Sequence, residues 1–415
     1  MLIEKKKINF LDMMIDLVFI TFFILHYLLP SFGHGMNFII PLFLAVAYAC
    51  YLGVKDFRLG ATLILFLGAI LFLTTMYTVL TDTKTIVSTA GGLEFKQFMS
   101  KFNQYALMFF PALLLYRVLK IGNRRYKTVL LLALAAIIAF VMVQTFIEVI
   151  KNPGALRHWE DFEDLASENV GTYTFVYGIP ILITALFACL KSFKLIGKLL
   201  GIAAIITMFV FLLHAEYTLA LIISFLGLIC VGYSSCRLKS TKILYVLFFV
   251  ILFFFLLPPI LKFAYSNIES KQVSLRLKEL YDFFVSGDSS GYNLNGRLTL
   301  YIDTLKAFLK SPLFGNSQLD FDGHATFITV LSDTGLLGAV PMYGLVFATQ
   351  RVVKKMLGES NRYFMPVFIG YILMGITNPI HSALPLAFAV WFIAPLTVEF
   401  FFNKENEKNE ECLEN

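Results

Sequence analysis

The chain has 415 residues, of which 58% are hydrophobic and only 15% are charged, and its mean hydropathy is +0.76. A water-soluble fold of this size does not carry so little charge, so the composition excludes a soluble enzyme and predicts a polytopic membrane protein. Apolar runs of about 20 residues match helices rather than the short strands of a barrel, so we expect an all-α fold.

The apolar runs predict twelve membrane-spanning helices in chain order. Nine of them fall in residues 1–262 and three in residues 324–402. A large polar loop, residues 263–323, separates the two groups, and a charged tail at residues 403–415 is expected to be disordered. The predicted spans cover residues 11–29, 36–52, 59–80, 102–119, 128–150, 171–190, 194–213, 217–233, 243–261, 324–350, 363–378 and 384–402.

The basic residues predict how the chain is oriented. If the N-terminus is cytoplasmic, most of the 34 Lys and Arg residues fall in cytoplasmic segments, as the positive-inside rule requires. We therefore expect both termini in the cytoplasm and the large loop outside. The net charge of +6 then follows from topology and needs no nucleic-acid partner.

The large loop has a helical pattern of its own. Apolar residues recur at helical spacing in residues 270–285, and again from Arg297 up to an SPLFG turn at residues 311–315. Between them, residues 287–296 are rich in turn formers. The loop therefore predicts two amphipathic helices that lie on the membrane surface or over a cavity.

Arg297 is a candidate anion-binding residue. Asn295 is the expected N-cap, which puts Arg297 in the first helical turn, where a cation opposes the helix dipole. A bound phosphate or diphosphate would remove that conflict, because free amides and a guanidinium fork both favour an anion. The alternative is a solvated surface arginine. Arg276, on the polar face of the first amphipathic helix near Lys278, is a second candidate.

Other chemistry is not indicated. The acidic loop at residues 151–169 lacks the ligand spacing of a calcium or zinc site. The chain has no nucleotide-binding glycine loop and no Walker-type lysine. We therefore expect neither a metal nor a cofactor, and no ATP-driven step.

The order of these segments resembles the O-antigen ligase and Wzy polysaccharide polymerase superfamily. The similarity rests on Arg297 and the helix after it, the SPLFG turn, His324, and the sequence DTGLLG at residues 333–338, together with the topology. The resemblance implies a metal-independent glycosyltransferase of the GT-C type in a bacterial plasma membrane. Its donor would be a glycan on undecaprenyl diphosphate, used on the extracytoplasmic side.

Carried over by position, the resemblance implies that Arg297 holds the diphosphate and that His324 orients or deprotonates the acceptor hydroxyl. A fixed cation stabilises the charge that develops on the leaving group, and an imidazole can accept a proton near neutral pH. The chain departs from the family in two places. Ala325 stands where the family usually has Asn, and Glu216 stands where a family arginine falls.

Glu216 has three interpretations. It could serve as the general base, it could hold one of the two arginines in place, or it could be an ordinary carboxylate at a helix end. Asp333 is treated differently, because on a straight helix it lies about 13 Å beyond His324 and on the opposite face. A carboxylate at that depth is costly, so we expect it to meet a polar partner on another helix and to act structurally.

We expect a surface or capsular polysaccharide polymerase that joins lipid-linked repeat units. The alternatives are an O-antigen-type ligase that moves a finished glycan to another acceptor, and a lipid-linked oligosaccharide flippase or transporter. A transporter would be expected to have repeated halves, and the sequence has no such repeat. These residues do not separate polymerase from ligase. Expected partners are the lipid-linked oligosaccharide, membrane lipid, a chain-length regulator and a flippase.

Overall fold

The computed structural model describes most of the chain, and its described part contains helices and no strands. The all-α prediction is therefore confirmed for these residues. The described residues are 10–34, 39–81, 92–121, 123–152, 155–157, 162–215, 217–236, 238–251, 255, 257–267, 274–275, 277–278, 281–282, 285, 294–315, 325–380 and 383–402.

The long helices follow the predicted spans closely in most of the chain. Two predicted spans are each divided: residues 171–190 form α8 and α9, and residues 243–261 fall on α12 and α13. The helices are α1 Phe10–Leu28, α2 Pro30–His34, α3 Ile39–Lys55, α4 Phe57–Thr81, α5 Gly92–Ile121, α6 Arg124–Lys151, α7 Phe162–Ser167, α8 Tyr173–Val176, α9 Ile179–Cys189, α10 Leu195–His214, α11 Thr218–Ser235, α12 Lys239–Ile251, α13 Leu257–Asn267, α15 Leu294–Lys310, α16 Thr326–Leu357, α17 Asn361–Thr377, α18 Leu384–Phe388 and α19 Ala394–Phe402.

The protein is a multi-pass membrane protein. Within the described residues, seven helical stretches are long and apolar enough to cross a bilayer, and the shorter helices α3 and α11 are also apolar. One of the seven stretches contains both α16 and α17. The total of twelve spans stays a prediction.

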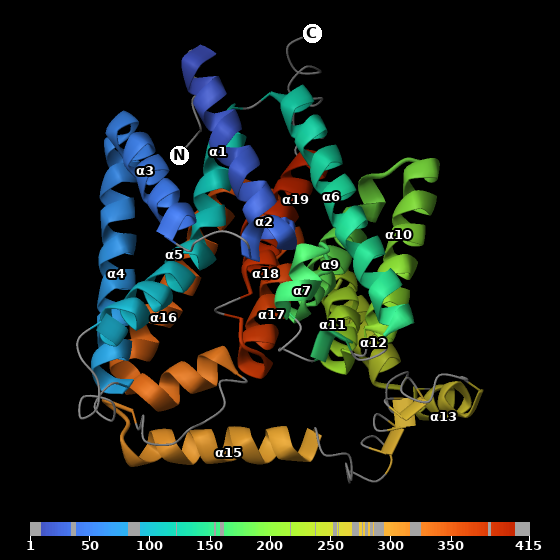
Figure 1. Ribbon diagram of the computed structural model, residues 1–415. Coiled ribbons are helices and arrows are strands. Elements are labelled where there is room, and N and C mark those ends of the chain that lie inside the picture. Colours follow the sequence, from blue (N-terminus) through green and yellow to red (C-terminus); the bar gives the residue numbers. More distant parts are fainter. Residues whose placement is uncertain are drawn as a thin grey trace.

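The bundle has two distinct ends (Figure 1). The helix α1 begins and α19 ends at one of them, which we call the charged end because ionic side chains gather there. The helix α15 lies crosswise at the opposite end, which we call the loop end. This arrangement puts the described part of the large polar loop on the other side of the bundle from Phe10 and Phe402.

The centre of the bundle is built from late parts of the chain. The helix α18, a π-helical turn at Ala389–Ile393 and α19 run without interruption, and they pack against α5, α9 and α17. Trp391 and Phe388 are completely buried there. By contrast, α4, α6 and α10 each expose a wide apolar face, as helices in contact with lipid do.

Two buried ion pairs connect helices near the charged end. Arg117 of α5 meets Asp16 of α1, with 2.6 Å between Nη2 and Oδ2, and the Tyr48 hydroxyl of α3 donates to the other Asp16 oxygen at 2.8 Å. Lys127 of α6 donates to Glu399 of α19 at 2.7 Å. A charged group inside a membrane protein is costly unless it is paired, so each of these residues depends on its partner.

We predict that Arg117→Leu lowers the free energy of unfolding by about 3–5 kcal/mol, because Asp16 is then left buried and unpaired. The measurement is thermal unfolding of the purified protein in mild detergent. The control is Lys306→Ala, which removes an exposed pair with Asp303 and should cost less than about 1 kcal/mol. Equal shifts in the two variants would show that the Asp16–Arg117 pair is energetically neutral.

Candidate functional site

The SPLFG turn is joined directly to the helix α16. The helix α15 ends at Lys310, and the turn follows with the Gly315 amide donating to the Ser311 carbonyl at 2.8 Å. The Leu336 amide donates to the Pro312 carbonyl at 2.9 Å, and the Leu337 amide donates to the Leu313 carbonyl at 3.2 Å. We call this contact between residues 311–315 and 333–337 the joint.

The joint exists because α16 is broken at Gly335. This residue has φ +60° and ψ −157°, so α16 consists of two helical pieces, residues 326–334 and 336–357. In an unbroken helix the amides of residues 336 and 337 would donate to carbonyls four residues earlier. The break frees them for the turn. The predicted span over residues 324–350 is therefore not one straight helix, and its first piece runs along α15 at the loop end (Figure 1).

Glycine is needed on both sides of the joint. A Cβ on Gly335 would lie 2.4 Å from the Leu313 carbonyl oxygen, and a Cβ on Gly315 would lie 2.4 Å from the Asp333 carbonyl. Both residues also have positive φ, a conformation that other residues adopt only with strain. Gly315 of the SPLFG turn therefore packs against the DTGLLG segment, and Gly335 of that segment packs against the SPLFG turn.

Further hydrogen bonds hold the start of α16 at the loop end. The Thr326 amide donates to the Asn378 carbonyl at 3.1 Å, and the Ile380 amide donates to the Thr326 hydroxyl at 2.7 Å. The Tyr301 hydroxyl of α15 donates to the Thr377 carbonyl at 2.9 Å. The helix α15, the start of α16 and the end of α17 thus form one connected surface.

The helix α15 packs through a different face from the one its apolar pattern suggests. Thr304 and Ala307 are buried, whereas Ile302, Leu305 and Leu309 are 45%, 42% and 70% exposed. Residues three and four apart share a helix face, so these three leucine and isoleucine side chains form an uncovered stripe. Small side chains face α16 because they let the two helices approach closely.

Asp333 lies in a polar cluster between α4, α5 and α16. The residue is 8% exposed, and Lys101 of α5 lies close enough to act on its charge. The Lys101 ammonium sits 4.8 Å from the centre of the Tyr77 ring of α4. Next to Asp333, the buried Ser332 hydroxyl has no hydrogen-bond partner among the described residues. The carboxylate of Asp333, which is part of the joint, therefore lies near the Lys101 ammonium and the Tyr77 ring, and Ser332 directly precedes the joint.

The structure describes the predicted site residues to different extents. Asp333 is fully described. Arg297 falls in the first turn of α15, which begins one residue before the expected cap Asn295, but its side chain lies outside the described part of the chain. His324, Glu216 and Arg276 lie outside the described residues.

Lys101 is a member of the cluster that the sequence analysis missed. The predicted span begins one residue later, at residue 102, whereas α5 begins at Gly92 and carries Lys101 as a helical, half-buried residue. One signal could have found it: Lys101, Gln104 and Tyr105 follow the helical i, i+3, i+4 spacing. Among the described residues, no group of three His, Cys, Asp or Glu side chains lies together as a metal site would require.

Comparisons with known proteins do not assign the chain to a family. No protein-family model matches it, and no curated protein is significantly similar to it.

We predict that Gly335→Ala destabilises the protein by about 1–3 kcal/mol, because it combines positive φ with a clash against Leu313. Gly344→Ala is the matched control in the same helix, since a Cβ there meets nothing within 4 Å. That change should be neutral or stabilising by up to about 1 kcal/mol. Thermal unfolding of both variants measures the difference, and similar stabilities would contradict the role of the break.

Proposed function

We propose that the protein is a polysaccharide polymerase that joins undecaprenyl-diphosphate-linked oligosaccharide repeat units on the outer leaflet of a bacterial plasma membrane. One observation carries the proposal. The SPLFG turn and the DTGLLG sequence, two of the segments on which the resemblance rests, are bonded to each other at the loop end. Two segments that share a site must lie next to each other, as these two do. Their close contact requires glycine at positions 315 and 335, which are the glycines of the two motifs.

The proposed reaction is a displacement at the anomeric carbon of the donor glycan. The acceptor hydroxyl oxygen forms a bond to that carbon, the bond between the carbon and the diphosphate oxygen breaks, and the undecaprenyl diphosphate leaves with the electron pair. The hydroxyl proton passes to the His324 imidazole, which can accept it near neutral pH. Glu216 is the second candidate for this proton.

Positive charge is expected to stabilise the leaving diphosphate. In this proposal Arg297, in the first turn of α15, binds the diphosphate, and Arg276 is a second candidate. The negative charge on the diphosphate grows as the glycosidic bond breaks, so a fixed guanidinium helps the transition state more than the ground state. Asp333 is part of the joint and Lys101 lies close to it, and we assign these two side chains to holding α16 against α5.

We predict that purified protein, mixed with a lipid-linked repeat unit and without ATP or metal, yields a ladder of products on a gel. The energy is already present in the bond between the anomeric carbon and the diphosphate of the donor, so no other source is required. A single transfer to a different acceptor would identify a ligase instead. Absence of any transfer, with protein that elutes as a single species, would contradict the proposal.

We predict that Arg297→Ala and His324→Ala each slow chain extension by about 10²–10³-fold, the usual loss when a charge-stabilising group or a general base is removed. Single repeat units should then accumulate on the carrier lipid. The control is Lys306→Ala, an exposed residue of the same helix α15, which should keep wild-type extension. Wild-type rates in the His324 variant would move the proton-accepting role to Glu216.

A further inference from the structure

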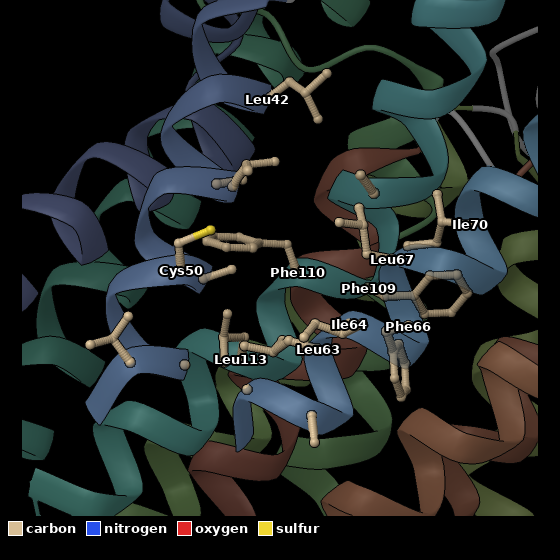
Figure 2. A pocket seen from close by; sticks show the side chains of 18 of the residues that line it. Leu42, Cys50, Leu63, Ile64, Phe66, Leu67, Ile70, Phe109, Phe110 and Leu113 are labelled. Carbon is tan, nitrogen blue, oxygen red and sulfur yellow. The ribbon is translucent and has the colours of Figure 1, made fainter. Parts of the chain in front are cut away.

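An apolar groove lies between α3, α4 and α5 (Figure 2). Its volume is about 490 Å³, within the range of small-molecule sites. Cys50 of α3 and Phe110 of α5 are among the side chains that line it (Figure 2). Apart from the Cys50 thiol, the described residues that line the groove contribute no charged or hydrogen-bonding side chain. An occupant of this groove must therefore be hydrocarbon.

The groove is elongated and lies toward the charged end. Its lining residues on α4 run from Phe57 to Ile70, which is about 20 Å along the axis of a helix that starts at that end. A hydrocarbon core is about 30 Å thick, so the groove extends through the half nearer the charged end and slightly beyond. This shape fits an extended chain from the leaflet at the charged end.

The mouth of the groove is exposed to the membrane surface. Val54 and Phe57, which line the groove at its charged end, are 89% and 87% exposed. Large apolar side chains with this much exposure mark a surface that contacts lipid or another molecule. Most of the other exposed residues of α3 and α4 are also apolar, Phe43 and Leu65 among them, so lipid is the surrounding medium along this side of the bundle.

The charged residues at the mouth of the groove favour an anionic head group. In the turn between α3 and α4, Lys55 pairs with Asp12, and Asp56 pairs with Lys120 at 3.4 Å. No carboxylate among the described residues pairs with Arg58, which is exposed. Arg58 also lies three residues before the groove residue Ala61, so the two share a helix face.

We propose that this groove binds one acyl chain of an anionic phospholipid from the leaflet at the charged end, with the lipid phosphate next to Arg58. The site is separate from the joint at the loop end, and it does not depend on the glycosyltransferase activity. Each exposed basic residue near an anionic surface adds roughly fivefold to lipid affinity. The bound lipid would seal α3 against α4 and α5.

The test is native mass spectrometry of the purified protein after exchange into equal amounts of phosphatidylglycerol and phosphatidylcholine. We expect about one phosphatidylglycerol retained per chain, in excess over phosphatidylcholine. Arg58→Gln should reduce that preference about fivefold. Equal retention of the two lipids by the wild-type protein overturns the proposal, and so does selective retention of a polyprenyl phosphate when that lipid is supplied as a third competitor.

A groove-filling variant locates the bound chain. Ala49→Phe places a ring inside the groove and should abolish retention of phosphatidylglycerol. The control, Ala136→Phe, adds the same ring to the exposed face of α6 and should leave retention unchanged. Undiminished retention in a folded Ala49 variant contradicts the location. Because the wild-type lipid preference is measured separately, the proposal can fail even if this variant does not fold.

Discussion

Inside a bilayer every backbone amide must find its hydrogen-bond partner within the protein, and this constraint explains the shape of the loop end. The break at Gly335 would leave the amides of residues 336 and 337 without their helical partners. The SPLFG turn supplies two carbonyls in their place. The interruption of α16 is thus tolerated because another segment is bonded into it, and α15 is held in place by the same two bonds.

The charged end follows a related rule for side chains. Asp16, Arg117, Lys127 and Glu399 are all nearly buried, and each has an opposite charge within 2.7 Å. Arg117 and Lys127 are among the basic residues near the expected cytoplasmic ends of predicted spans. In the structure both residues form interhelical ion pairs. Their positions therefore reflect the packing of α1 with α5 and of α6 with α19 as much as the orientation of the chain in the membrane.

The helices were predictable from sequence because apolar length alone determines them in a membrane. The interruption of a helix was not predictable, because a single residue such as Gly335 leaves the mean hydropathy of the segment unchanged. The short motifs were found, but their contact was not, because bonding between residues 312 and 336 depends on a turn in the backbone. Lys101 lies outside the predicted span because the apolar run begins at Phe102. The buried pairs escaped notice because each partner lies on a different helix.

The Lys127–Glu399 pair has a consequence for how the chain is made. The two residues are 272 positions apart, so α6 is synthesised and inserted long before α19 exists. Until the last helix arrives, the Lys127 ammonium lacks the carboxylate with which it pairs in the complete bundle. Completion of the polypeptide is thereby coupled to closure of the bundle.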